Sequence, residues 1–299
     1  MSDGFSLWQG VIYPLVIQPF ADFGFMRRAL VACCVLALSV GPVGVLLVLR
    51  RMSLLGDAVA HAMLPGAAMG FFGAGLSIWA MSAGGFIAAM VVALGAGLLT
   101  RWTSQKEDAS FAALYLVALS LGVLMISVRG TSVDLTHILF GNILAVDDDA
   151  LLLIGCVSSV TLVALALFYR PLLISCVDPA FLAAQGQPLA RTHHIFLTLM
   201  VINMVAAFQA LGTLMAVGLM MLPALAARFW VNDVPRLWLL SSSLAMLCGA
   251  SGLLLSYHFE LPSGPAIVLV AGGVYALSLG LGQRDSLRVR LSRTRHLKV

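Results

Sequence analysis

Charged side chains are scarce in this sequence. Only 17 Lys and Arg and 13 Asp and Glu occur among 299 residues, or 10% of the chain, whereas 61% of the residues are hydrophobic. A soluble domain carries about 25% charged residues, so this composition excludes an ordinary soluble protein. The charges that remain separate apolar runs of about 20 residues, the length that crosses a bilayer as a helix. The sequence therefore predicts a polytopic membrane protein.

Signatures of ATP hydrolysis, proteolysis and thiolate chemistry are also absent. Lys106 and Lys298 are the only lysines, and neither follows the GxxxxGKS/T pattern whose lysine holds phosphates, so we expect no ATP hydrolysis by this chain. The HExxH zinc-protease motif is missing. An aspartyl protease would need a second Asp inside an apolar run to pair with Asp57, and we find none. The five cysteines form no CxxC pair, which argues against a disulfide framework and a thiolate metal site.

The apolar runs predict an all-α fold of eight or nine transmembrane helices. The number is open because little separates the sixth run from the seventh between Ala210 and Thr213. We expect an interfacial N-terminal segment (1–28), one transmembrane domain (29–283) and a basic cytoplasmic tail (284–299). The runs lie at 29–49, 54–73, 76–100, 109–128, 150–168, 192–210, 212–229, 237–257 and 264–282.

Lys and Arg are distributed unevenly between the two sides of this arrangement. With the C-terminus in the cytoplasm, all of the 17 except Arg27, Arg28 and Arg129 fall on the inner side. Cytoplasmic loops of membrane proteins carry this excess of positive charge. The sequence thus predicts a multi-pass protein of the cell (inner) membrane with a cytoplasmic C-terminus, and its net charge of +4 reflects topology and not nucleic-acid binding.

Asp57 and His61 are the ionisable pair of the second apolar run. Residues four apart share one face of a helix, so the carboxylate and the imidazole point the same way. With Arg51 at the cytoplasmic boundary, His61 lies about 15 Å further along a helix, near the middle of a hydrocarbon core about 30 Å thick. Ionisable groups at this depth usually mark a substrate or ion path, and this pair suits a divalent transition metal. A buried polar pair satisfied by a neighbouring helix is the alternative.

The loop between Arg170 and Arg191 contains the start and stop signals of a short helix. Asp178 is a capping residue, Pro179 suits the first helical position, and Gly186 ends the helix. We expect this helix to expose Phe181 and Leu182. It is either a connecting helix that lies on the membrane or a docking peg for a soluble partner.

Other polar residues have simpler interpretations. Asp147, Asp148 and Asp149 precede an apolar run, where carboxylates favour the N-terminus of a helix, and a funnel for metal ions is the alternative. His193 and His194 begin a run on the cytoplasmic side and are expected to be solvated. The residues that could line an entrance on the outer face, or be merely solvated there, are Asp134, His137, His258 and Glu260.

The sequence contains five further informative stretches, namely Arg50–His61, Val133–Asn142, Asp178–Phe181 with Gly186, Gln209–Gly212 through Leu222–Ala224, and Leu261–Pro265. Together they resemble the permeases of zinc/manganese-type ABC importers, in family order from about residue 27 to residue 282. The resemblance looks closest to a zinc-importing subgroup, although manganese permeases share the same motifs.

This resemblance implies a homodimeric permease that carries two cytoplasmic ABC ATPase subunits and receives its ion from an extracytoplasmic metal-binding protein. It implies that Asp57 and His61 serve the passage of Zn²⁺ or Mn²⁺, zinc being favoured, with no permanently bound cofactor and no enzymatic activity in this chain. The resemblance also implies an ATPase-docking helix, formed by Asp178, Pro179, Phe181, Leu182 and Gly186. The alternative function is a proton-coupled secondary metal carrier, which would use the Asp57/His61 pair as a proton relay and would not need the docking helix.

Overall fold

The computed structural model describes residues 8–52, 54–75, 77–103, 107–128, 143–186 and 188–284, together with Ser286 and Arg288. Within these ranges all regular secondary structure is helical and no strand occurs, which confirms the expected all-α fold. The helices are η1 (Trp8–Ile17), α2 (Gln18–Asp22), α3 (Gly24–Leu49), α4 (Leu55–Ala62), α5 (Leu64–Ala74), α6 (Ile78–Trp102), α7 (Glu107–Val128), η2 (Ile143–Ala145), α9 (Asp148–Leu167), α10 (Tyr169–Val177), α11 (Pro179–Ala184), α12 (Leu189–Leu211), α13 (Thr213–Arg228), α14 (Val234–Phe259) and α15 (Ser263–Leu281).

Seven of the described helices are long and apolar enough to cross a membrane, with apolar parts of 19 to 26 residues. These helices are α3, α6, α7, α9, α12, α14 and α15. The expectation of eight or nine such helices is therefore not confirmed. The two remaining expected spans, 54–73 and 212–229, correspond to the α4–α5 pair and to α13, which has 16 residues.

Two local breaks explain these shorter helices. Pro65 lies in the first turn of α5 and has no N–H to donate to the carbonyl of His61, so α4 ends before this residue and α5 begins anew. The second apolar run is therefore divided into two helices at this place. Gly212 has a φ of +82°, a conformation that favours glycine, and it separates α12 from α13.

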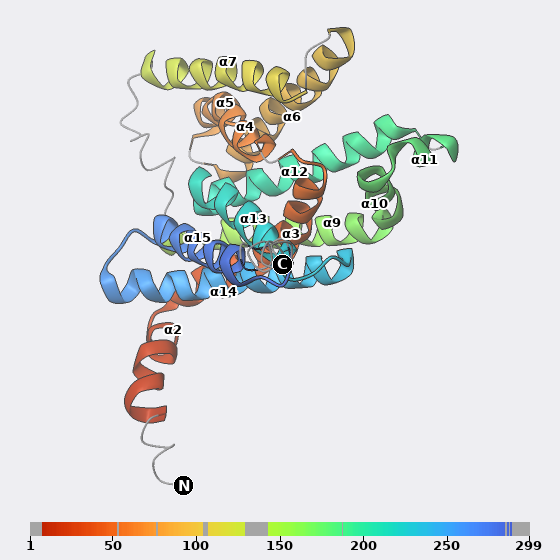
Figure 1. Cartoon of the computed structure of the whole chain (residues 1–299). Helices are drawn as coiled ribbons and strands as arrows, with labels where there is room; N and C mark the ends of the chain where they lie inside the picture. Colours follow the sequence, from red (N-terminus) through yellow and green to blue (C-terminus); the bar gives the residue numbers. More distant parts are fainter. Residues whose placement is uncertain are drawn as a thin grey trace, which may run out of the picture.

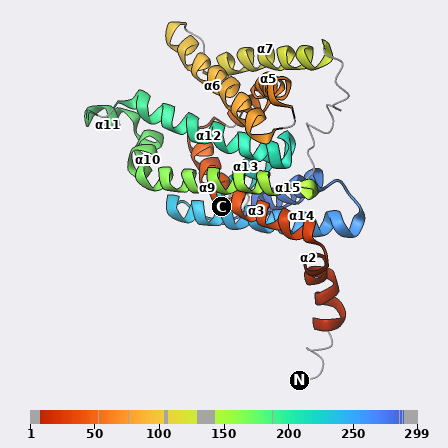
Figure 2. The same cartoon turned by 180° about the vertical axis from the view of Figure 1, so that it is seen from behind.

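Helix α3 forms the centre of the bundle. In its apolar 18-residue stretch, 78% of the residues are buried. The helix contacts α9, α13 and α14. Figures 1 and 2 show α4, α5 and α7 on one side of α12, and α14 and α15 on the other. In the corresponding 18-residue stretch of α7, only 17% of the residues are buried. An apolar helix with so much free surface suits contact with lipid hydrocarbon.

The N-terminal helices η1 and α2 extend away from the bundle (Figure 1). They are held at the C-terminal end of α14, where His258 Nε2 lies 2.8 Å from the carbonyl oxygen of Leu15. The rings of Phe23 and Tyr257 add a contact with centroids 5.7 Å apart. The interfacial position of residues 1–28 stays a prediction.

Glycine permits the closest helix contact beside the second apolar run. A Cβ on Gly66 of α5 would collide with the carbonyl oxygen of Gly84 in α6, and a Cβ on Gly84 would collide with that of Gly66. The backbones of α5 and α6 therefore touch at this point, as small residues allow in membranes. This contact fixes α5, which continues from the helix that carries Asp57 and His61.

We predict that Gly66→Ala lowers the thermal stability of the protein in detergent. The added methyl group has no room against Gly84, and overpacking of this kind costs about 1–3 kcal/mol. Gly73→Ala is the matched control, because Gly73 lies on the same helix with no atom within 4 Å of a Cβ at this position. In that open site the change should leave the melting temperature equal or slightly higher. Equal melting temperatures for both variants would disprove the tight contact.

Candidate functional site

Helix α4 holds Asp57 and His61 on one face. His61 Nε2 lies 3.5 Å from Asp57 Oδ1, and their side chains are 23% and 56% exposed. The rest of the helix is buried, since Leu55, Val59 and the small residues of α4 pack into the bundle. Neighbours of α4 are α6, α7, α12 and α13. The pair thus forms an accessible polar site on an otherwise apolar helix.

The imidazole of His61 is held by packing more than by hydrogen bonds. Its Nδ1 is buried and has no hydrogen-bond partner among the described residues. Its ring lies nearly parallel to that of Tyr115 in α7, with centroids 6.1 Å apart and an interplanar angle of 26°. Sequence reasoning missed Tyr115, because a tyrosine in an apolar run gives no sign that another helix will bring a histidine against it.

The Asp57/His61 pair supplies one oxygen and one nitrogen donor. No group of three or more His, Cys, Asp or Glu side chains suited to a metal ion occurs in the part of the chain that the structure describes. In the same part, no side chain of a neighbouring helix hydrogen-bonds to either residue. The pair therefore offers two ligands to an ion and leaves other coordination positions to groups outside it.

The short helix expected in the loop 170–191 is α11, and Figure 1 shows it at the edge of the molecule beside α10. Asp178 Oδ1 accepts a hydrogen bond from the N–H of Phe181 at 3.0 Å. Gly186 has a φ of +74° and allows the chain to turn after the helix. Phe181 is 51% exposed, as expected, whereas Leu182 is only 1% exposed. The expectation of an exposed Leu182 is wrong, because a short helix between α10 and α12 must turn one side inward.

Of the residues considered for an outer entrance, the two that the structure describes, His258 and Glu260, form no interaction with the Asp57/His61 pair. His258 contacts the carbonyl of Leu15, and Glu260 ends α14 in the left-handed conformation with a φ of 52°. Asp134 and His137 lie outside the described residues. Asp147 caps α9 as expected, since its Oδ1 accepts a hydrogen bond from the N–H of Ala150 at 2.9 Å.

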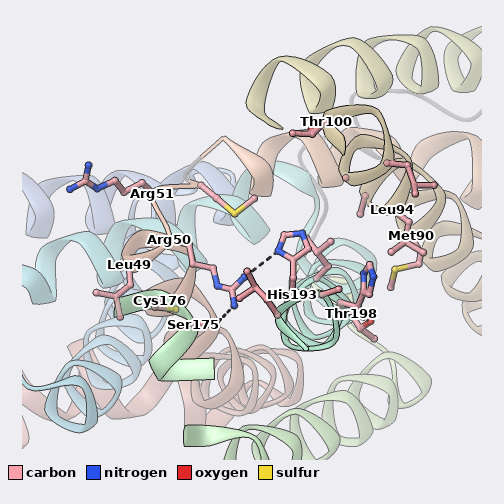
Figure 3. A pocket seen from close by; sticks show the side chains of 18 of the residues that line it. Leu49, Arg50, Arg51, Met90, Leu94, Thr100, Ser175, Cys176, His193 and Thr198 are labelled. Carbon is pink, nitrogen blue, oxygen red and sulfur yellow. Dashed lines mark hydrogen bonds between the residues drawn. The ribbon is translucent and has the colours of Figure 1, made fainter. Parts of the chain in front are cut away.

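A second polar site lies beside a cavity of about 1180 Å³ between α3, α6, α10 and α12. Arg50, at the end of α3, points toward Ser175 and His193 in the wall of this cavity (Figure 3). The expectation that His193 is solvated is wrong, because His193 is half-buried and contacts Arg50. Sequence reasoning placed Arg50 in the positive charge of the inner side and in the stretch Arg50–His61, and no local pattern could have indicated partners so distant in the chain.

Comparison with known proteins identifies a family that this chain matches. Residues 22–281 match the ABC 3 transport family. The manganese transport system membrane protein MntC of Halalkalibacterium halodurans is 32% identical over 279 residues, which cover 93% of this chain and 94% of that protein. The manganese import system permease protein ScaB of Streptococcus gordonii is 34% identical over 274 residues, or 90% of this chain and 95% of that protein.

Solved structures agree with these relatives. The structure of PsaBC from Streptococcus pneumoniae in complex with Fab contains a chain that superposes with a TM-score of 0.83 at 31% identity, covering 94% of this chain and all of that one. An inward-facing putative metal-chelate type ABC transporter shares the fold, with a TM-score of 0.64 at 17% identity over 84% of each chain. The match over most of the chain, together with relatives above 30% identity along nearly their whole length, shows that this membrane protein belongs to the ABC 3 transport family.

Proposed function

We propose that this chain is the permease subunit of an ATP-driven importer of divalent transition metal ions, and that Asp57 and His61 bind the ion in transit. The observation that carries the proposal is the contact of this carboxylate and this imidazole on one face of α4, a helix that is otherwise apolar and buried. Ionisable groups at membrane depth usually mark an ion path. Family membership supports a transport role for the whole chain.

The geometry of the pair suits transient binding. An ion that enters the bundle loses water ligands, and one carboxylate oxygen and one imidazole nitrogen replace two of them. Two protein ligands make a weak site, and a site on a conduction path must be weak enough for the ion to leave. Asp57, with more than half of its side chain exposed, is open to an approaching ion. Tyr115, against the ring of His61, limits the orientations of the imidazole.

Manganese is our first candidate for the transported ion. The names of the similar proteins MntC and ScaB specify manganese, and the preference for zinc inferred from the sequence finds no support among them. The donor chemistry agrees, because carboxylate oxygen suits Mn²⁺ and imidazole is acceptable to several divalent metals. Zinc remains the competitor against which selectivity should be measured.

The proposed assembly contains further subunits. The absence of a phosphate-binding loop from the sequence requires a separate ABC ATPase, for which the exposed Phe181 of α11 offers an apolar contact. We propose that an extracytoplasmic metal-binding protein delivers the ion and that two copies of this chain form the permease. A homodimer would also supply groups from the second copy to a pair that has only two protein ligands. In this assembly α4–α5 and α13 complete the set of membrane-crossing segments.

We predict that Asp57→Asn and His61→Ala each reduce manganese uptake by about tenfold or more, since even the loss of an outer partner costs a metal site this much. Asn keeps the shape of Asp57 and removes its charge, so a loss would report on charge and not on packing. Uptake of radioactive manganese, with zinc as competitor, is measured at matched expression in cells that lack other importers. Asp233→Asn, at an exposed carboxylate paired with Arg236, is the control.

Near-normal uptake by both variants would show that Asp57 and His61 have only a structural role.

The same assay in proteoliposomes distinguishes ATP-driven uptake from uptake driven by a proton gradient. Uptake should require the ATPase subunit and ATP, whereas robust uptake driven by a proton gradient alone would identify a secondary carrier.

A second prediction concerns the docking helix. Phe181→Asp places a charge in the expected contact with the ATPase, so the ATPase should no longer co-purify and ATP-driven uptake should be lost. The permease itself should stay folded, because Phe181 is half exposed. Trp102→Asp introduces the same charge at an aromatic residue that is 80% exposed at the end of α6, and it should leave co-purification unchanged. A stable, active complex with Phe181→Asp would show that α11 does not dock the ATPase.

A further inference from the structure

Arg50 connects three helices through one guanidinium group. Its Nη2 donates a hydrogen bond to Ser175 Oγ in α10 at 2.7 Å, and its Nη1 lies 3.3 Å from His193 Nδ1 in α12. Its Cζ lies 4.2 Å from the centroid of the Phe196 ring, also in α12. Figure 3 shows Arg50 directed at both polar partners, whereas Arg51 points away from them. We call Arg50, Ser175 and His193 the arginine clamp.

The hydrogen bonds of the clamp have a fixed direction. A guanidinium can only donate, so Nδ1 of His193 must accept, which places the proton of the neutral imidazole on Nε2. Ser175 donates its own hydroxyl proton to the carbonyl of Leu172 at 2.7 Å, which leaves its lone pairs to accept from Arg50. Among the described residues, no carboxylate forms an ion pair with Arg50. The charge is thus held by neutral acceptors and an aromatic face.

The partners of Arg50 lie on either side of the proposed docking helix. Ser175 belongs to the last turn of α10, just before Asp178, and His193 belongs to the first turns of α12, after Gly186. One guanidinium therefore holds the chain both where it enters α11 and where it leaves it. A displacement of α11 relative to the bundle would act on Arg50 from both of these flanks.

Arg50 also lies in the turn that precedes α4, the helix that carries the Asp57/His61 pair. The N–H groups of Arg50, Arg51 and Met52 bond back to the last turns of α3, and Arg51 takes a φ of 58° to redirect the chain. Helix α4 begins at Leu55, directly after this tight turn. Only four residues separate Arg50 from Leu55, so we expect a shift of Arg50 to change the position of α4.

We propose that Arg50 is a positioning residue that couples the docking helix α11 to the Asp57/His61 pair through the arginine clamp. The proposal rests on the proposed function, in which α11 receives the motion of an ATPase. Arg50 does not touch the ion. It transmits displacement from α10 and α12 to the start of α4. The cavity of about 1180 Å³ beside the clamp leaves space between α6 and α12 in which these helices can shift.

The test measures coupling in the full complex of permease, ATPase and metal-binding protein reconstituted in proteoliposomes. Arg50→Lys keeps the charge and removes the fork that reaches two acceptors at once. The complex should assemble and hydrolyse ATP, but the amount of manganese taken up per ATP should fall about tenfold, a typical coupling between distant sites. Arg51→Lys is the matched control and should leave this ratio unchanged, because Arg51 points away from the clamp (Figure 3).

Variants of the acceptors separate coupling from folding. Ser175→Ala and His193→Leu each remove one acceptor and should lower the ratio as Arg50→Lys does, whereas His193→Asn returns an acceptor oxygen near the place of Nδ1 and should restore it in part. His194→Ala, at the exposed neighbour, should have no effect. If Arg50→Lys does not assemble, the two acceptor variants decide the question.

A normal ratio of manganese to ATP in the clamp variants would overturn the proposal. That outcome differs from failure of the proposed function, which would appear already in the unmodified complex as uptake without ATPase or as no uptake. A fall of ATP hydrolysis and uptake in equal proportion would also overturn it, since the ratio would then be unchanged.

Discussion

The cost of placing a carboxylate and an imidazole inside an apolar helix bundle is the constraint on which this structure depends. Such groups are expensive at membrane depth and persist where they pair or serve transport. Among the residues that the structure describes, Asp57 and His61 pair only with each other, at 3.5 Å, and they remain partly exposed. The described parts of the surrounding helices pack against the pair, as the ring of Tyr115 does, and form no hydrogen bond with it. The helix break at Pro65 and the glycine contact between α5 and α6 fix the segment that follows the pair.

The hydrogen bonds of Arg50 connect this pair to the expected cytoplasmic side. Few side chains in the bundle form hydrogen bonds between distant helices, and Arg50 forms two of them. Among the described residues, its place between the last turn of α3 and the start of α4 makes it the nearest such contact to the ion site along the chain. In the proposed mechanism, force applied at α11 reaches the Asp57/His61 pair over a short path of helix ends, without passing through the apolar core.

The sequence was sufficient wherever a feature is local. The spacing of Asp57 and His61, the cap at Asp178 and the glycine at 186 each predict their structure within a few residues, and the apolar runs predict the long helices. Features that depend on packing between distant segments were missed or wrong. The burial of Leu182, the ring of Tyr115 against His61 and the contact of Arg50 with His193 are examples. The number of spans is not confirmed, because hydropathy does not register the breaks at Pro65 and Gly212 that shorten two of the expected helices.

The central claim is that the transported ion contacts His61 directly. Pulsed electron paramagnetic resonance of Mn²⁺ trapped in the full complex tests it, because an imidazole ligand adds nitrogen hyperfine coupling to the manganese spectrum. The account predicts this coupling in the unmodified complex and in His194→Gln, and its loss in His61→Gln. Bound manganese without nitrogen coupling, or with a coupling that survives in His61→Gln, would contradict the account.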